Sequence, residues 1–190
     1  MTPRTASALT VLLALIVTAC GGPDEPGVPE PPPPPPDLTG ALILLLPSQG
    51  QPQLDPELGF WLAERAPRTT WVLPDRLQGV VDRSPGWRVR LDALPPGFTE
   101  RQGRRRVTGQ LYDHLRRLGA MLDARLALVP YAIPVADSTG VMLEVTGVLV
   151  DVVGGRVVWH GTARGDPAPA GTAPSPASAA QALARALSAF

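Results

Sequence analysis

Short apolar runs alternate with segments of helical periodicity from residue 41 onward. The continuous apolar run over residues 41–46 is closed by turn-forming residues, and its length predicts a strand that is covered on both faces. The following apolar positions recur at helical spacing and predict a helix over residues 55–66, with Asp55 as its N-cap and Pro56 as its first residue. The folded part of the chain is therefore expected to open with a strand and a helix.

A second strand and a second helix follow the first pair. Residues 69–73 are rich in strand-forming side chains, and Pro74 opens a short amphipathic helix. The pattern is weaker over residues 84–103. Alternation at residues 87–91 is compatible with an edge strand, which the next Pro-Pro-Gly sequence would end.

The clearest periodicity in the chain lies over residues 107–123 and predicts a long amphipathic helix. Its apolar stripe consists of Val107, Leu111, Leu115, Leu118 and Leu122. Polar and charged residues occupy most of the opposite side. One face of this helix is therefore expected to pack on the core.

Three β-branched or alternating segments come next, over residues 125–135, 140–151 and 156–162. Gly154-Gly155 suits a tight turn, so the last two segments are expected to be antiparallel neighbours. A helix over residues 178–190 ends the pattern. This order predicts an α/β (α+β) two-layer sandwich, with about four helices packed on a mixed sheet that ends in an antiparallel meander.

A different pattern occupies the amino-terminal segment. An apolar core over residues 8–17 has the length of a signal peptide and is too short to span a bilayer. Val17-Thr18-Ala19-Cys20 resembles the lipobox of bacterial lipoproteins, whose cysteine is acylated before cleavage. The alternative, a buried free cysteine, is disfavoured by the Gly- and Pro-rich sequence that follows. We predict a signal peptide over residues 1–19 and a membrane anchor through lipid on Cys20, the single cysteine of the chain.

Residues 20–37 form a predicted tether between this anchor and one domain over residues 38–190. The tether holds almost no side chain that packs, and it includes consecutive prolines from Pro31 to Pro36. Because polyproline II extends about 3.1 Å per residue, the tether is expected to hold the domain up to roughly 50 Å from the membrane. The alternative to a spacer is that this proline-rich segment is a ligand for proline-binding modules. Gly21 after the cysteine favours the outer membrane, facing the periplasm, over the inner membrane.

Composition and charge narrow the classes of function. The net charge is zero, from 17 basic and 17 acidic residues, so no general electrostatic signal indicates nucleic acid as a partner. His114 and His160 have no neighbours at metal-ligand spacing. Asp113 and His114 have no Gly-x-Ser-x-Gly elbow to accompany them. We therefore predict no catalytic residue, no metal and no cofactor, and we expect the protein not to be an enzyme.

Two short motifs resemble one group of bacterial envelope proteins. They are the step from Leu118-Gly119-Ala120 into Asp123-Ala124-Arg125 and the segment Val150-Asp151-Val152-Val153-Gly154-Gly155-Arg156-Val157-Val158-Trp159. Both are similar to the α/β fold of the TolB amino-terminal domain, CsgG and LpoB. The chain lacks the long hairpins of CsgG and the propeller of TolB. Its layout resembles that of LpoB, which implies a non-enzymatic protein that reaches from the outer membrane to a partner.

The strongest charge asymmetry of the predicted domain is a cluster of arginines. Arg101, Arg104, Arg105 and Arg106 precede the long predicted helix, where positive charge opposes the helix dipole. Either these arginines are solvent-exposed residues at the start of the helix, or they bind an anionic ligand. The second alternative has a chemical basis, because guanidinium groups bind carboxylate and phosphate in bidentate fashion. Trp87, in the irregular section, is the best candidate for an exposed partner contact.

Two functions are compatible with these patterns. The leading expectation is a lipid-anchored, non-catalytic adaptor or assembly factor that binds another protein of the cell envelope. The alternative is a module that binds glycan or an anionic envelope polymer through the arginine cluster.

Overall fold

The computed structural model describes residue 34 and residues 36–95, 98–101, 104–169 and 171–188. All of these residues belong to one compact unit that covers residues 32–190. Cys20, the predicted signal peptide and most of the predicted tether lie outside the described residues and stay predictions. No helix within the described residues has the length and apolar character needed to cross a membrane.

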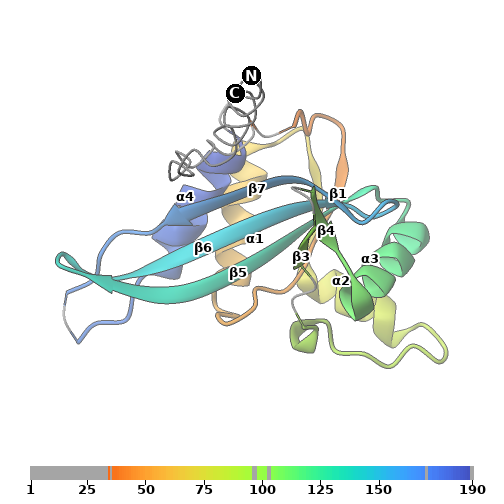
Figure 1. Cartoon of the computed structure of the whole chain (residues 1–190), viewed down its shortest axis with the longest axis horizontal. Helices are drawn as coiled ribbons and strands as arrows, with labels where there is room; N and C mark the ends of the chain where they lie inside the picture. Colours follow the sequence, from red (N-terminus) through yellow and green to blue (C-terminus); the bar gives the residue numbers. More distant parts are fainter. Residues whose placement is uncertain (1–33, 35, 96–97, 102–103, 170, 189–190) are drawn as a thin grey trace, which may run out of the picture. The chain divides into compact units, whose positions relative to one another are not determined.

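One mixed sheet forms the centre of the described residues (Figure 1). Its seven strands stand in the order β2-β1-β5-β6-β7-β4-β3. Their bounds are Leu42–Leu45 (β1), Thr70–Val72 (β2), Phe98–Arg101 (β3), Arg104–Val107 (β4), Leu126–Asp137 (β5), Gly140–Asp151 (β6) and Arg156–Arg164 (β7). The neighbours β2, β1 and β5 run parallel, and every other neighbouring pair is antiparallel. The predicted mixed sheet with a carboxyl-terminal meander is confirmed.

Helices pack on both faces of this sheet. Their bounds are Leu54–Arg65 (α1), Pro74–Asp82 (α2), Gly109–Leu122 (α3) and Pro176–Leu187 (α4). Neighbouring strand residues point to opposite faces, so Leu149 of β6 packs with Leu58 of α1 and Leu183 of α4, whereas Val150 packs with Leu115 of α3. The predicted packing of four helices on the sheet is thereby confirmed, but the helices cover both faces, which gives three layers and not the two that the sequence predicted. α1 and α4 also pack against each other.

A pair of glycines allows α4 to approach the sheet closely. Gly147 of β6 lies directly opposite Gly161 of β7. The indole of Trp159 lies against both: a Cβ atom placed at Gly161 would come within 2.5 Å of Cζ2 of Trp159, and one at Gly147 within 3.3 Å of Cζ3. Leu183 of α4 closes the same space, since its Cδ1 would lie 3.0 Å from a Cβ at Gly147. The missing side chains therefore make room for the buried tryptophan.

The expected N-cap at Asp55 is wrong. α1 begins one residue earlier, at Leu54, with Gln53 at the N-cap position. Asp55 instead accepts a hydrogen bond of 2.7 Å from the backbone N–H of Ser48 in the loop that follows β1. Burial raises the pKa of Asp55, while the bonds from Ser48 act to lower it. The carboxyl group thus ties the loop after β1 to the first turn of α1.

The expected edge strand over residues 87–91 is also wrong. This segment contains no strand and leads into a short 3-10 helix, Leu91–Ala93. The long helix starts at Gly109 rather than at residue 107, because Val107 is the last residue of β4. Its buried side chain joins the same core as the helix, which is why the apolar stripe appeared to continue into it.

Candidate functional site

Around Tyr131 of β5, Thr146 of β6 and Thr162 of β7, the sheet has one face that no described helix covers. In Figure 1 this face looks toward the viewer to the left of α3, with α1 and α4 behind the strands. Two rows of directly opposed residues cross it. The rows are Tyr131-Thr146-Thr162 and Ile133-Glu144-Arg164. We call the surface formed by these six residues the open face.

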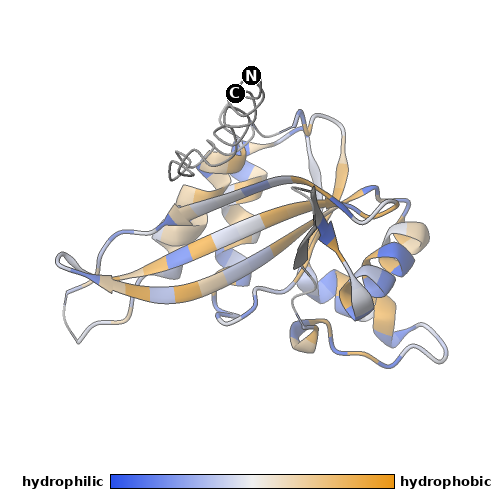
Figure 2. Cartoon of the chain, viewed as in Figure 1, coloured by the Kyte–Doolittle hydropathy of each residue, from blue (hydrophilic) through white to orange (hydrophobic). Residues whose placement is uncertain are grey.

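The open face combines exposed apolar side chains with a polar ladder. Tyr131 is 43% exposed and Ile133 is 39% exposed, both on β5. Beside them, the hydroxyl oxygens of Thr146 and Thr162 lie 2.9 Å apart. Figure 2 shows the underlying alternation of hydrophobic and hydrophilic positions along β5 and β6. Exposed aromatic and branched side chains next to polar groups are typical of a protein contact surface.

An ion pair holds the second row of the open face in place. Nε of Arg164 donates to Oε2 of Glu144 at 2.7 Å, so the two opposite charges on neighbouring strands satisfy each other. The pair adds order and specificity more than stability, because an exposed ion pair contributes about 0–1 kcal/mol.

Prolines block the outer edge of β5 next to the open face. Ala132 donates its N–H to the carbonyl of Gln49, and Gln49 donates to the carbonyl of Pro130, so the even-numbered residues of β5 direct their backbone groups to this edge. Pro134 shares that parity and has no N–H to offer an added strand. This edge of β5 is therefore a poor template for the addition of another strand.

Trp87 is buried, so the expectation that it is exposed is wrong. The residue is 8% exposed, and its Nε1 donates to Nδ1 of His114 on α3 at 2.9 Å. The guanidinium carbon of Arg117 lies 5.9 Å from the centre of the indole ring. Burial lowers the pKa of His114, and the neighbouring Arg117 lowers it further, although Asp113 acts in the opposite direction. The neutral imidazole is the form that accepts the indole hydrogen bond.

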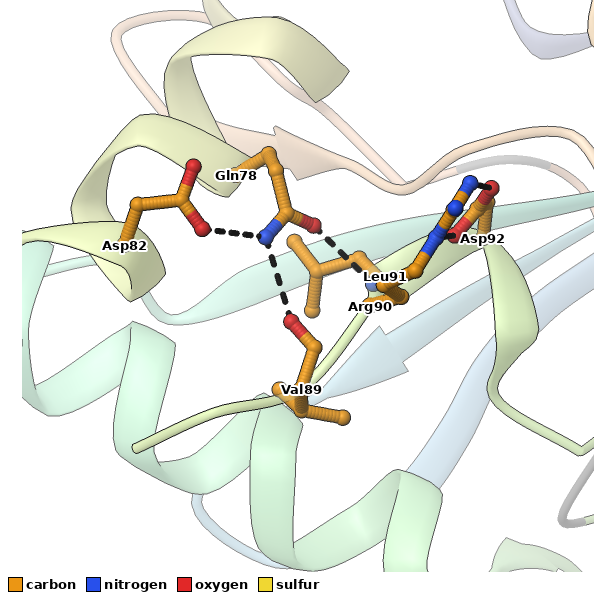
Figure 3. Close-up of polar contacts among 6 residues, drawn as sticks. All are labelled: Gln78, Asp82, Val89, Arg90, Leu91 and Asp92. Carbon is orange, nitrogen blue, oxygen red and sulfur yellow. Dashed lines mark hydrogen bonds and ion pairs between the residues drawn. The ribbon is translucent and has the colours of Figure 1, made fainter. Parts of the chain in front are cut away.

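Gln78 of α2 holds the loop around Trp87 (Figure 3). Its Nε2 donates to Oδ1 of Asp82 at 2.8 Å and to the carbonyl of Val89 at 3.1 Å, while its Oε1 accepts from the N–H of Leu91 at 3.0 Å. Between this loop and the end of α2 lies a cavity of about 550 Å³. The chain itself uses both N–H donors of the Gln78 amide and one acceptor site of its oxygen, and this network accounts for the shape of the loop.

The arginine cluster lies on a hairpin and not at a helix entry, which corrects that expectation. Arg101 is the last residue of β3, and Arg104, Arg105 and Arg106 lie on β4. Register places Arg101 opposite Arg104, and Arg106 opposite Arg156 of β7. The same register places Glu100 opposite Arg105, so the hairpin sets opposite as well as like charges against each other.

The structure joins some of the expected site residues and separates others. Trp87 lies with His114 and Arg117, and not on the β3-β4 hairpin that carries the arginine cluster. Across the described ranges, no group of three or more His, Cys, Asp and Glu residues is placed to hold a metal ion. The sequence did not predict the open face. The alternation over residues 125–151 nevertheless indicates that every second side chain of these strands lies on one face.

Comparison with known proteins gives likenesses at the level of solved structures. No family model matches the chain, and no curated protein matches it. Two PelC dodecamer structures from Paraburkholderia phytofirmans share 15% and 14% identity with TM-scores of 0.49 and 0.47; each covers 83% of this chain, and 94% and 93% of PelC. Lipoprotein GNA1162 from Neisseria meningitidis shares 15% identity with a TM-score of 0.42, over 71% of this chain and 86% of that protein. At such identities and TM-scores these likenesses assign the chain to no family.

Proposed function

We propose that the protein is a lipid-anchored, non-catalytic component of the bacterial cell envelope, and that its domain binds another envelope protein through the open face. The predicted lipid on Cys20 supplies the anchor, and the proline-rich tether supplies the reach. Gly21 supports an outer-membrane anchor that faces the periplasm. The adaptor or assembly role predicted from the sequence thereby gains a specific contact surface.

The observation that carries this proposal is the exposure of Tyr131 and Ile133 on β5, a strand whose Leu128, Val129 and Ala132 are buried in the two cores. Burial of such side chains in a contact contributes about 25 cal/mol for each Å² of apolar surface removed from water. The polar ladder beside them is already paired within the chain, which reduces the desolvation cost of a partner that covers it. A protein surface with complementary apolar side chains fits this combination.

A photoreactive amino acid at position 133 tests the proposal in the full chain, within living cells of the source bacterium. We expect irradiation to give a discrete covalent adduct with another protein. The matched control places the same group at Phe60 of α1, which is 57% exposed and lies outside the open face. An absence of adduct at position 133, or the same adduct at both positions, contradicts the proposal.

The arginine hairpin supports a second candidate function, the binding of an anionic envelope polymer. Its specific observation is the placement of Arg101, Arg104, Arg105 and Arg106 on one hairpin, with Arg106 opposite Arg156 of β7. Guanidinium groups form bidentate contacts with the carboxylate and phosphate groups of such a polymer.

Sedimentation with purified cell wall tests this second candidate. Joint replacement of Arg104, Arg105 and Arg106 by Ala is expected to reduce the bound fraction several-fold, because three positive charges leave one hairpin. The control variant replaces the exposed Arg76, Arg83 and Arg88 by Ala and keeps the same net charge change. Equal sedimentation of the two variants and the parent chain would remove the polymer hypothesis.

A further inference from the structure

A second cavity lies where the chain enters the domain before β1. Its volume is about 420 Å³, which lies within the range of roughly 300–1,000 Å³ typical of small-molecule sites. Its lining is largely apolar. It includes Leu38 of the entering chain, Leu62 of α1, Trp71 of β2 and Leu187 of α4. We call this cavity the tether-end pocket.

Two arginines contribute positive charge to the tether-end pocket. Arg65 is the last residue of α1, and Arg68 lies in the loop that leads to β2; both line the pocket and are exposed. Within the described part of the chain, neither has a carboxylate within 4.0 Å. Asp37 also lines the pocket, but its carboxylate accepts the N–H of Thr39 at 2.9 Å. Among the described residues, the two guanidinium groups therefore have no acidic side chain to pair with.

Trp71 of β2 adds an aromatic wall to this pocket. The residue is half-buried, and its Nε1 is fully buried. The indole therefore offers apolar ring surface to the contents of the pocket and not a hydrogen-bond donor.

The ends of α1 and α4 converge on the pocket, and this limits which anions fit. Leu62 and Arg65 belong to the last turn of α1, and Leu187 ends α4. Helix carboxyl termini carry partial negative charge, which repels a free anion. A ligand that gains most of its binding energy from an apolar tail depends least on the anionic contact that this field weakens.

We infer that the tether-end pocket binds the acyl chain of an anionic phospholipid, with the phosphate held by Arg65 and Arg68. The apolar floor receives the hydrocarbon, and the arginines pair with the phosphate through charge-assisted hydrogen bonds. The predicted anchor at Cys20 enters only as the reason why the pocket meets a membrane. The inference is independent of the open face, so either proposal can fail without the other.

Photolabelling of the purified full chain tests this inference. The probe is a soluble lysophosphatidylglycerol with a diazirine in its acyl chain, and mass spectrometry of peptides locates the label. We expect label on peptides that contain residues 62–71 and 184–188. We also expect it to be several-fold weaker in the Arg65→Ala, Arg68→Ala double variant, while the Arg76→Ala, Arg116→Ala control retains the parent level.

A second labelled probe and an unlabelled competitor distinguish the lipid from other ligands of the pocket. An amphiphile with the same diazirine chain and an ammonium head group is expected to label the pocket several-fold less. Excess inorganic phosphate is expected to leave labelling largely unchanged, since it lacks the acyl chain. Label confined to residues 1–19, equal labelling of both double variants, or complete displacement by inorganic phosphate would overturn the inference.

Discussion

Replacement of Gly161 by Val is expected to destabilise the domain by about 1–3 kcal/mol, because overpacking a filled core costs that much. The Cβ atom that the substitution adds at position 161 would lie 2.5 Å from Cζ2 of Trp159. The ring cannot simply move away, since it is only 2% exposed and Leu183 packs in the same core cluster. A rigid indole also has fewer ways to adjust than a flexible side chain. Thermal unfolding is therefore expected to shift down by roughly 2–10 °C.

A second glycine in the same part of the chain provides the control. A Cβ at Gly154, in the turn between β6 and β7, would meet only Oδ2 of Asp151 at 3.8 Å. Gly154→Ala is therefore expected to change the free energy of unfolding by less than about 0.5 kcal/mol. Equal unfolding midpoints for Gly161→Val and the parent chain would show that the glycine pair does not shape the packing of Trp159.

Replacement of Cys20 by Ala is expected to abolish lipid attachment completely. The chain has one cysteine, so no other thiol can accept the acyl group. Because acylation precedes cleavage in lipoproteins that carry this motif, the variant is also expected to keep residues 1–19 and to migrate as a larger precursor.

Incorporation of labelled palmitate, together with the mass of the purified protein, measures this outcome. Membrane fractionation alone is a poor test, since an uncleaved apolar segment over residues 8–17 would hold the precursor at the membrane. Thr18→Ser keeps a small residue before the cysteine and is expected to retain full label. Label that persists in Cys20→Ala would contradict the predicted anchor.

Local periodicity was sufficient to predict most of the fold. The alternation over residues 125–162 predicted three strands, which the structure places at Leu126–Asp137, Gly140–Asp151 and Arg156–Arg164. The apolar stripe along the long helix predicted α3, whose buried side chains lie on one side. These elements were predictable because each buries a regular set of apolar positions against one core.

The β3-β4 hairpin was missed because its sequence lacks that signal. Most residues of Phe98–Arg101 and Arg104–Val107 are polar, so no apolar alternation marks the two strands. Val107, the last residue of β4, joins the core, and its apolar side chain appeared to extend the next helix. A search for apolar alternation cannot reveal strands whose sequence lacks it.

Contacts distant in sequence explain why the sites were harder to predict than the fold. Trp87 and His114 are separated by 27 positions, and nothing local indicates that the indole is buried beneath α3. The tether-end pocket joins three segments, represented by Leu38, Trp71 and Leu187, that meet only in the folded domain. The composition of single segments gives no information on such juxtapositions.

Loss of the partner complex on alteration of the open face is the most direct test of the proposed function. The variant Tyr131→Glu, Ile133→Glu places two carboxylates on the face, and the control Phe60→Glu, Met121→Glu places two on exposed side chains elsewhere. The amount of partner recovered with each full-length protein after crosslinking is measured, alongside its unfolding midpoint. The open-face variant is expected to lose at least about tenfold in recovered partner, equivalent to about 1.4 kcal/mol, with its fold retained. Full recovery with the open-face variant, or an equal loss with the control, would contradict the account.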